Sequence, residues 1–345
     1  MHKVTVLYIT FMENIKGDMV IEENASHGVR DVIVYCKKSS FRAWNKWRAF
    51  KKAIEYFGEN DRLTFDVVHH NVIWNSGWQA LWLRHKFGWP YVITEHWTGF
   101  GNERKNEQSL FLKPFAKRVT RNASMICPVS TDLAVTMREF GLDGNYRVVP
   151  NVVDTSIFTW KNRDDSIIRF LHVSSLVDDH KNITGILEAW KLASGQNDHI
   201  HLTIGGDGPW RQWETISDSL GISKERITFF GEKDPPGIAS LMSVSHCLLL
   251  FSKYENMPVV IIEALASGMA IISSDVGGIR EHITPERGYL VSAKDNAALT
   301  TAILTFAQEY SRFDGDQLRA YAIDNFSVEA VAAAYDEVYR KLVDF

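Results

Sequence analysis

The sequence predicts an α/β protein with two doubly wound, Rossmann-like domains, each built on a parallel sheet. In the second half of the chain, short apolar runs alternate with segments of helical length, the pattern of a parallel sheet covered by helices. The first half repeats this pattern less regularly. A polar stretch follows RVVPNVVD. We therefore expect domains at residues 1–152 and 153–325 and a terminal helix at 326–345.

The second half gives the clearer alternation. Buried strands appear as apolar runs of four to eight residues, and helices repeat apolar residues three or four positions apart. The predicted strands are 170–176, 201–206, 227–231, 247–252 and 270–275, and the predicted helices are 185–194, 209–221, 237–244 and 258–268.

The first half contains the same kinds of element. Strands are predicted at 2–10, 31–38, 65–70, 90–96 and 124–130, and helices at 41–57, 77–88 and 130–141. The terminal helix carries an apolar stripe of Val328, Val331, Ala332, Tyr335 and Val338, which needs a partner surface.

The composition limits the class of protein. The 345 residues are 45% hydrophobic and 23% charged, as in an ordinary soluble protein. No apolar run is long enough to span a bilayer, and the first residues do not read as a signal peptide. Three scattered cysteines, Cys36, Cys127 and Cys247, show neither disulfide nor zinc spacing, which favours the cytoplasm.

The stretch SKYENMPVVIIEALASGM, from Ser252 to Met269, places Glu263 among apolar residues. A buried carboxylate without a partner is costly, so Glu263 is either on an exposed stripe of its helix or meets a polar group. Glu255 precedes the same helix, in a loop at the carboxyl end of a predicted strand, where ligands bind in open α/β sheets. Both carboxylates could therefore reach one ligand.

The predicted helix Phe41–Phe57 is basic and aromatic. Residues 1–150 carry 21 Lys and Arg against 15 Asp and Glu, whereas residues 151–345 carry 17 against 27, so the first half is the one suited to an anionic surface. Two interpretations stay open for residues 37–57: a surface helix that buries its aromatic stripe, or a contact with an anionic membrane at its inner face. Nucleic acid is not expected, because no binding module accompanies the charge.

The segment ENMPVVIIEALASGMAIISSDVGGIREHI resembles the E-x7-E signature of glycosyltransferase family 4, also called glycosyltransferase group 1. DVVHHN, VITEHWTG, PVSTDL, VVPNVVDTSIF, HVSSLVDDHKN, IGGDGP and ITFFGE match the family in the right order. The resemblance covers essentially the whole chain. It implies the GT-B fold, in which two Rossmann-like domains face each other across a cleft, with the terminal helix packing back on the N-terminal domain.

The resemblance also implies roles for particular residues. Glu255 would contact the transferred sugar, Glu263 would bind the ribose hydroxyls, and Lys181 would bind the diphosphate. Ser175 stands where the family usually has an arginine. His96 would contact the sugar from the N-terminal domain, and the family makes His96, Lys181 and Glu255 the catalytic candidates. The donor-binding candidates are Ser175, Lys181, Gly206, Phe230, Gly231, Glu255, Asn256, Met257, Val259 and Glu263.

The implied reaction is the retaining transfer of a sugar from a nucleoside diphosphate sugar to a glycan or lipid-linked acceptor, as in polysaccharide, capsule or lipopolysaccharide biosynthesis. It needs no cofactor and no metal; Asp314-Gly315-Asp316 has a D-x-D form but is predicted to be a turn. One alternative is a nucleotide-sugar-binding protein with little or no turnover, and a GT-B epimerase or phosphorylase is another.

One departure from the family concerns the start of the chain. Members begin with a strand, a Gly-rich loop and a helix. Residues 2–10 and 31–38 resemble the second and third strands of the family, so we expect this first βα unit, roughly 30 residues, to be missing.

Overall fold

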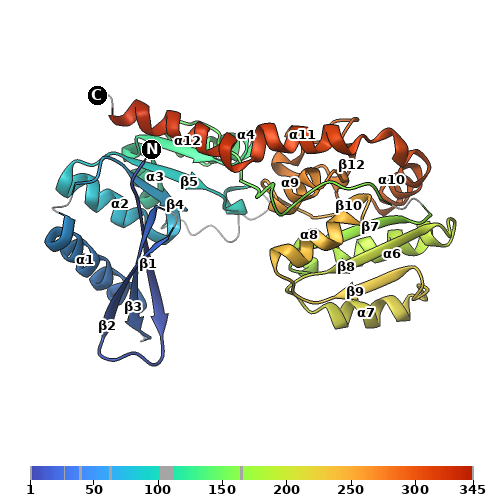
Figure 1. Cartoon of the computed structure of the whole chain (residues 1–345), viewed down its shortest axis with the longest axis horizontal. Helices are drawn as coiled ribbons and strands as arrows, with labels where there is room; N and C mark the ends of the chain where they lie inside the picture. The colour runs from blue at the N-terminus through green and yellow to red at the C-terminus, as the bar shows by residue number, and fades with distance from the viewer. Residues whose placement is uncertain are drawn as a thin grey trace. The chain divides into compact units, whose positions relative to one another are not determined.

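The computed structural model describes residues 2–26, 28–38, 41–61, 64–101, 112–163 and 166–343 (Figure 1). It contains two compact units. Unit 1 consists of residues 1–68 and 82–89, and unit 2 of residues 69–81 and 90–345. The predicted boundaries after residues 152 and 325 both fall inside unit 2 and stay a prediction.

Unit 1 is a three-stranded sheet covered by a helix. Strand β1 (Val4–Met12) pairs in parallel with β3 (Val29–Lys37), which pairs on its other edge in antiparallel with β2 (Met19–Ser26). The sequence did not predict β2, because Glu22, Glu23 and Asn24 are poor strand formers. In the structure, Glu23 of β2 forms an ion pair with Arg30 of β3 at 2.7 Å.

The core of unit 1 joins β3 to helix α1 (Arg42–Asp61). Alternate residues of β3 face the helix, and residues three or four apart on α1 face the sheet. The buried set is Val32, Val34, Cys36, Ala49, Phe50, Ala53, Ile54, Phe57 and Leu83. The aromatic stripe of the predicted helix is thus buried over its second half. At its start, Phe41 and Trp44 are exposed by 74% and 62%.

Unit 2 begins with a second three-stranded sheet in the order β4-β5-β6. Its elements are β4 (Val68–Asn71), α2 (Ile73–Phe87), β5 (Tyr91–Glu95), η1 (Thr98–Phe100), α3 (Leu112–Asn122), β6 (Met125–Pro128) and α4 (Thr131–Glu139). Strands β5 and β6 are parallel, and every residue of β5 is buried. Because β5 is buried along its whole length, the first residues of the loop after it have a fixed position. The division between the units runs through β4 and α2.

The largest sheet of unit 2 has six strands in the order β12-β11-β10-β7-β8-β9, and every neighbouring pair is parallel. Its strands are β7 (Ile168–Val173), β8 (Ile200–Gly205), β9 (Ile227–Phe230), β10 (Cys247–Leu250), β11 (Ala270–Ser274) and β12 (Gly288–Val291). The predictions of parallel strands and an α/β class are confirmed, and β12 is an addition to them.

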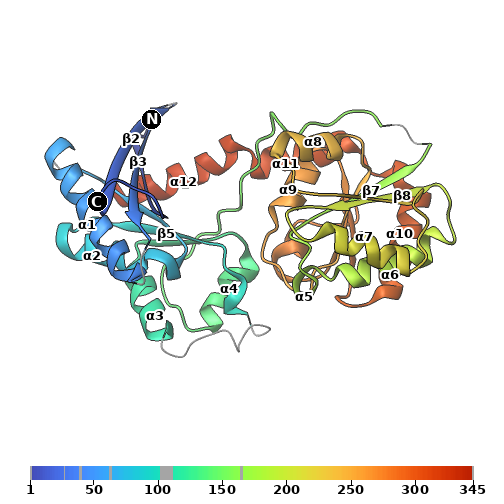
Figure 2. The same cartoon turned by 90° about the horizontal axis from the view of Figure 1, so that it is seen from below.

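Helices cover both faces of this sheet (Figure 2). They are α5 (Asp178–Lys181), α6 (Ile183–Ser194), α7 (Trp210–Ser219), α8 (Pro235–Ser243), α9 (Val259–Ala266), η3 (Gly277–Glu281), α10 (Asn296–Glu309), η4 (Tyr310–Arg312) and α11 (Gly315–Phe326). Asp314, predicted to lie in a turn, caps α11 by accepting from the backbone N–H groups of Asp316 and Gln317.

The last helix, α12 (Val328–Val343), contacts the β4-β5-β6 sheet through hydroxyl groups. The Tyr339 hydroxyl lies 2.5 Å from His69 Nδ1, and the Tyr335 hydroxyl lies 2.6 Å from Thr94 Oγ1. The apolar stripe is narrower than predicted, because Val328 and Ala332 are exposed while Val331 and Val338 are buried. Residues 344 and 345 of the predicted helix lie outside the described residues.

None of the helices in the described ranges combines the length and the apolar character needed to cross a membrane.

Candidate functional site

The six-stranded sheet has one point where its strand order reverses. The chain runs from β7 outward through β8 to β9, and then returns to β10 on the other side of β7. The loops after β7 and β10 therefore diverge from neighbouring strand ends, which leaves room for a ligand at the carboxyl edge. Helix α5 follows β7, and the segment Phe251–Pro258 follows β10. This edge contains most of the predicted site residues.

All ten donor-binding candidates lie at the carboxyl ends of four adjacent strands or in the loops and helices that follow them. Ser175 and Lys181 follow β7, Gly206 follows β8, Phe230 and Gly231 end β9, and Glu255, Asn256, Met257, Val259 and Glu263 follow β10. Asn256 and Met257 are buried, whereas Val259, at the first turn of α9, is 43% exposed.

Glu255 has a preformed cationic partner. Its side chain is only 7% exposed, and it forms an ion pair with Lys181 Nζ, whose side chain is 14% exposed. Burial would raise the pKa of the Glu255 carboxyl, but the nearby imidazole of His180 and the charge of Lys181 outweigh burial and hold the pKa below its ordinary value. Glu255 is therefore ionised at neutral pH.

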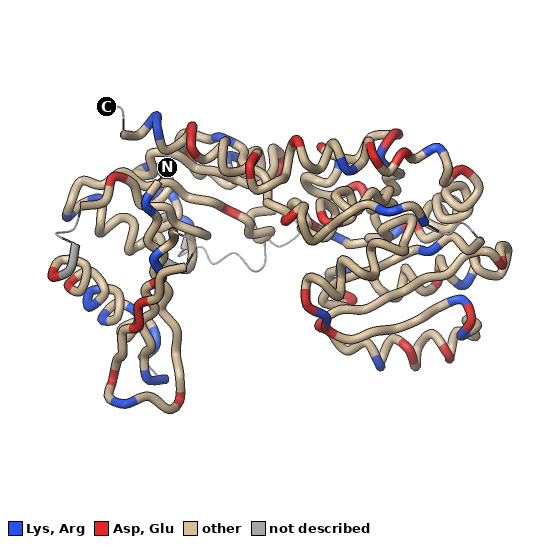
Figure 3. The backbone as a smooth tube through the Cα atoms, viewed as in Figure 1, with Lys and Arg blue, Asp and Glu red and all other residues tan. Residues whose placement is uncertain are grey.

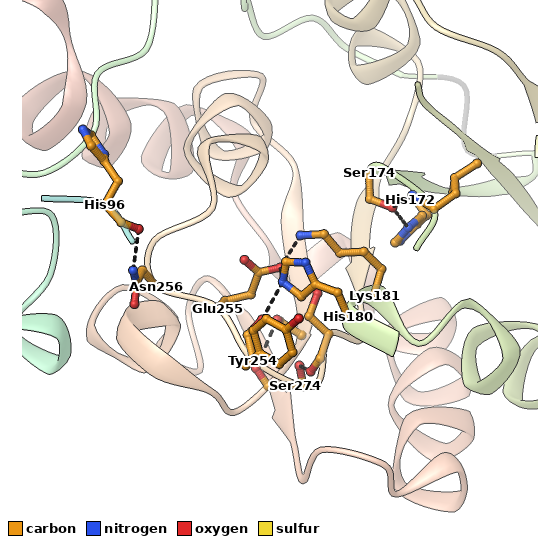
Figure 4. A network of polar contacts seen from close by, with 12 residues as sticks. His96, His172, Ser174, His180, Lys181, Tyr254, Glu255, Asn256 and Ser274 are labelled. Atoms are coloured by element: carbon orange, nitrogen blue, oxygen red, sulfur yellow. Dashed lines mark hydrogen bonds and ion pairs between the residues drawn. The ribbon is translucent and has the colours of Figure 1, made fainter. Parts of the chain in front are cut away.

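His180 and Tyr254 join α5 to the loop before α9 (Figure 4). Their rings stack at a centroid distance of 4.3 Å and an interplanar angle of 6°. His180 Nε2 donates to the Tyr254 carbonyl at 2.8 Å, and the Lys253 N–H donates to the His180 carbonyl at 2.8 Å. These contacts fix the backbone on both sides of the Lys181–Glu255 pair.

The surroundings of Glu263 differ from those of Glu255. Glu263 lies in the second turn of α9, between the buried residues Ile262 and Ala264. Within the part of the chain that the structure describes, no hydrogen-bond donor meets its carboxylate. Burial alone raises the pKa of Glu263 to about 7. The carboxylate thus has unused capacity to accept hydrogen bonds.

A fully buried histidine, His172, fixes the turn after β7 through hydrogen bonds. The His172 Nδ1–H donates to the Leu249 carbonyl at 2.8 Å, so Nε2 accepts from the Ser174 hydroxyl at 2.8 Å. The Ser174 oxygen in turn accepts from the Leu176 N–H at 3.1 Å. Burial lowers the pKa of His172 to about 4, so the ring is neutral at pH 7. The turn that contains Ser175 is fixed without a cation.

Two glycines let the loop after β8 approach this turn. A Cβ at Gly206 would lie 1.8 Å from the Ser174 carbonyl oxygen, and a Cβ at Gly208 would lie 1.9 Å from that of Ser175. Any side chain at either position would force the two loops apart. The GGDGP segment is therefore required for the packing of the site.

His96 follows β5, and hydrogen bonds join it to the loop that contains Glu255. Asn256 Nδ2 donates to the His96 carbonyl at 2.6 Å, and Asn151 Nδ2 donates to the Met257 carbonyl at 2.7 Å. Burial lowers the pKa of the His96 imidazole, and a hydrogen bond with Asn151 opposes that shift. Figure 4 shows the His96 carbonyl facing Asn256.

A buried carboxylate fixes the backbone around His96. Glu95 is fully buried and accepts from the N–H groups of His96 and Trp97 at 2.9 Å each, and from that of Ile73 at 3.0 Å. Burial raises the pKa of Glu95, and the three backbone donors oppose that rise. His96 is therefore held at the end of a rigid strand.

The sequence predictions missed five residues of this arrangement: Glu95, Asn151, His172, His180 and Tyr254. Asn151 and His172 lie in the segments VVPNVVDTSIF and HVSSLVDDHKN, whose similarity to the family was a usable signal. Glu95 and His180 lie in the matching segments VITEHWTG and HVSSLVDDHKN, which carried the same signal, whereas Tyr254 lies outside the matching segments.

No metal centre is apparent in the described ranges. No three His, Cys, Asp or Glu side chains come together there in a way that could hold an ion.

Comparison with known proteins gives the class of this chain. The family model described as "Glycosyltransferase Family 4" matches residues 2–157, and the model described as "Glycosyl transferases group 1" matches residues 168–309. The chain belongs to the group 1 glycosyltransferases, family 4. Because the first model begins at residue 2, the comparison does not show that an N-terminal unit is missing.

Curated relatives include named transferases. The MMP alpha-(1->4)-mannosyltransferase of Mycolicibacterium hassiacum is 26% identical over 81% of this chain and 71% of its own length. The putative teichuronic acid biosynthesis glycosyltransferase TuaC of Bacillus subtilis is 25% identical over 79% of this chain and 67% of its own. The N-acetyl-alpha-D-glucosaminyl L-malate synthase of Bacillus anthracis is 31% identical, but over 46% of this chain and 42% of its own.

Solved structures share the fold. The sucrose-phosphate synthase of Thermosynechococcus elongatus aligns with a TM-score of 0.79 at 22% identity, covering 99% of this chain and 89% of that one. Anabaena HepE, solved in complex with UDP and glucose, aligns with a TM-score of 0.70 at 16% identity, covering 91% and 86%. The predicted GT-B fold is confirmed.

Proposed function

We propose that this protein transfers a sugar, with retention of configuration, from a nucleoside diphosphate sugar to a glycan or lipid-linked acceptor. The observation that carries the proposal is the pair of carboxylates around the start of α9. Glu255 is ionised and paired with Lys181, whereas Glu263 is half-buried, unpaired and has a pKa of about 7. A nucleotide sugar has a diphosphate that can pair with the cation of Lys181 and two ribose hydroxyls that can donate to Glu263.

Each residue has a role that its surroundings favour. The ribose hydroxyls would donate to Glu263, in charge-assisted hydrogen bonds that an ionised carboxylate accepts well. Lys181 would bind the diphosphate, on which negative charge accumulates as the glycosidic bond breaks. The N–H groups of Asn256 and Met257 precede α9, whose dipole favours anions at that end. Glu255 and His96 would contact the sugar, and no step requires a metal.

The relatives suggest the kind of product. One is a mannosyltransferase and another is named for teichuronic acid biosynthesis, so a polysaccharide is the favoured acceptor class. HepE was solved with UDP and glucose, which makes UDP-sugars the first donors to test. We place the reaction in the cytoplasm, where nucleotide sugars are made.

Helix α1 supports a contact between this enzyme and an anionic membrane. Phe41 and Trp44 are exposed at its start, and basic residues follow along the helix (Figure 3). Exposed aromatic rings beside cations suit the interface of an anionic bilayer. Vesicles that contain phosphatidylglycerol should bind the protein, and Phe41→Ser with Trp44→Ser should weaken binding. Trp78→Ser, at another exposed tryptophan, is the control and should have no effect.

A second function, nucleotide-sugar binding with little turnover, is favoured by one observation. Ser175 gives the diphosphate site a hydroxyl where the family usually has a guanidinium. Stabilisation of developing charge by one such group is worth about 10²–10³ in rate. On this alternative the protein would bind donors and transfer their sugars slowly.

The test is a calorimetric screen of UDP-, GDP- and ADP-sugars, followed by measurement of nucleoside diphosphate release with candidate glycan acceptors. Release that depends on an acceptor supports the transferase, and NMR of the product's anomeric carbon reports retention. Binding without acceptor-dependent release supports the alternative. If no nucleotide sugar binds, both functions are excluded.

A further inference from the structure

His180 lies within reach of the carboxylate that the proposed function uses. Its Nε2 is 3.5 Å from Glu255 Oε1, while it donates to the Tyr254 carbonyl at 2.8 Å. The parallel stack on Tyr254 holds the ring in this orientation, with one nitrogen facing the two oxygens (Figure 4). The imidazole is therefore a ready second partner of Glu255.

Once a donor is bound, two anionic groups compete for Lys181: the Glu255 carboxylate and the donor diphosphate. In the structure the Lys181 ammonium group is paired with Glu255. The diphosphate of the donor carries more negative charge than one carboxylate, so it draws the ammonium group toward itself. Glu255, at 7% exposure, would then be a buried carboxylate that has lost its cation, a strongly unfavourable state.

We propose that His180 is a positioning residue that takes over Glu255 when the donor diphosphate draws Lys181 away. The inference rests on the proposed function. A movement of under about 1 Å brings Nε2 within the range of a charge-assisted hydrogen bond, and its N–H can be shared with the Tyr254 carbonyl during that movement. Glu255 keeps its charge and its direction toward the sugar, and Lys181 is free to stabilise the leaving group.

The first experiment compares the binding of a nucleoside with the binding of its diphosphate. The affinities of uridine and UDP are measured by calorimetry for the wild type and for His180→Phe, which keeps a stacking ring and loses the N–H. The adenine or guanine series replaces these probes if the donor screen selects another base. Uridine binding should not change, because it does not displace Lys181. UDP binding should weaken by about tenfold to a hundredfold, as for a lost hydrogen bond to a charged group.

Two further variants guard against a purely structural effect. His180→Gln keeps an N–H donor, so its UDP affinity should stay within about threefold of that of the wild type. This variant also tests the inference if His180→Phe folds poorly. His199→Phe makes the same change at a side chain that is 77% exposed, outside the site, and should bind UDP like the wild type.

A double-mutant cycle assigns the effect to Glu255. In a Glu255→Gln background the neutral amide needs no cation, so adding His180→Phe should change UDP affinity by less than about twofold. Equal losses in both backgrounds, or an unchanged UDP affinity of His180→Phe, would overturn the inference while leaving the proposed function intact. A wild type that binds no nucleotide at all would overturn both.

Discussion

The loop before α9 and the second turn of α9 each hold a carboxylate, and the two differ in their partners and in the direction of their pKa shifts. Glu255 meets Lys181 and His180, and its pKa is lowered; Glu263 meets no donor of the described chain, and its pKa is raised to about 7. Folding alone completes the first site and leaves the second with an unfavourable charge. This difference is what a protein needs if one carboxylate is held ready for chemistry and the other is satisfied only by a ligand.

The largest effect is expected from removing the cation that distinguishes the two carboxylates. Lys181→Met should lower turnover by about 10²–10³, because the leaving diphosphate loses its fixed charge. It should also destabilise the fold by about 3–5 kcal/mol, since Glu255 becomes a buried unpaired charge. Steady-state kinetics and urea unfolding measure these effects. Lys224→Met, at a lysine that is 80% exposed, is the control and should change neither quantity.

Removing the unpaired carboxylate should have opposite effects on binding and on stability. Glu263→Gln should weaken donor binding by about 1–3 kcal/mol, through lost hydrogen bonds to a charged group. Without ligand at pH 8 the same variant should be more stable than the wild type, by up to about 3 kcal/mol, because a pKa raised from 4.5 to about 7 marks a destabilised charge. A variant that is less stable, with unchanged donor affinity, would refute the ribose assignment.

The raised pKa predicts how stability depends on pH. The native state holds the Glu263 proton more tightly than the unfolded state, whose pKa is near 4.5. The contribution of Glu263 to unfolding free energy therefore falls as pH rises from about 4.5 to 7 and is constant above that range. The difference in stability between the wild type and Glu263→Gln should follow this curve. A difference independent of pH would show that Glu263 is not perturbed.

Donor affinity should depend on pH in the opposite direction. If ribose hydroxyls donate to the ionised carboxylate, as we propose, the protonated protein must lose a proton to bind. The donor dissociation constant should rise as pH falls below about 7, by at most about tenfold per pH unit, and Glu263→Gln should lack this dependence. An identical dependence in both proteins would assign the titration to another group, such as the donor phosphate.

The smallest effect concerns the contact between the Glu255 loop and His96. Asn256→Ala removes a 2.6 Å hydrogen bond to the His96 carbonyl. We expect turnover to fall by about tenfold or less, equivalent to about 0.5–1.5 kcal/mol, with donor affinity little changed. A loss as large as that of Lys181→Met would mean that this contact orders the whole site.

The predictable and unpredictable parts of this protein differ for physical reasons. Strands such as β10 and β11 could be predicted because they are buried on both faces and read as continuous apolar runs. Strand β2 could not, because its polar residues pair along an edge of the sheet. Glu263 stood out as one charge in an apolar helix.

Contacts between distant residues set a different limit. Lys181 and Glu255 lie 74 positions apart, so their ion pair follows from the fold rather than from local pattern. The sequence analysis did not single out His180, because the partner that fixes its ring, Tyr254, lies 74 positions away. Glu95 read as an ordinary end of a strand, because its three partners are backbone N–H groups that no sequence displays.

The central claim is that Glu263 is kept unpaired for the donor. The most direct test is a carbon-13 NMR titration of glutamate side-chain carboxyl carbons, with the Glu263 signal assigned by its loss in Glu263→Gln. We predict a pKa of about 7 in the free protein, and a fall toward or below the ordinary value when a donor nucleotide is saturating. A pKa near 4.5 in the free protein, or one that the nucleotide leaves unchanged, would contradict the account.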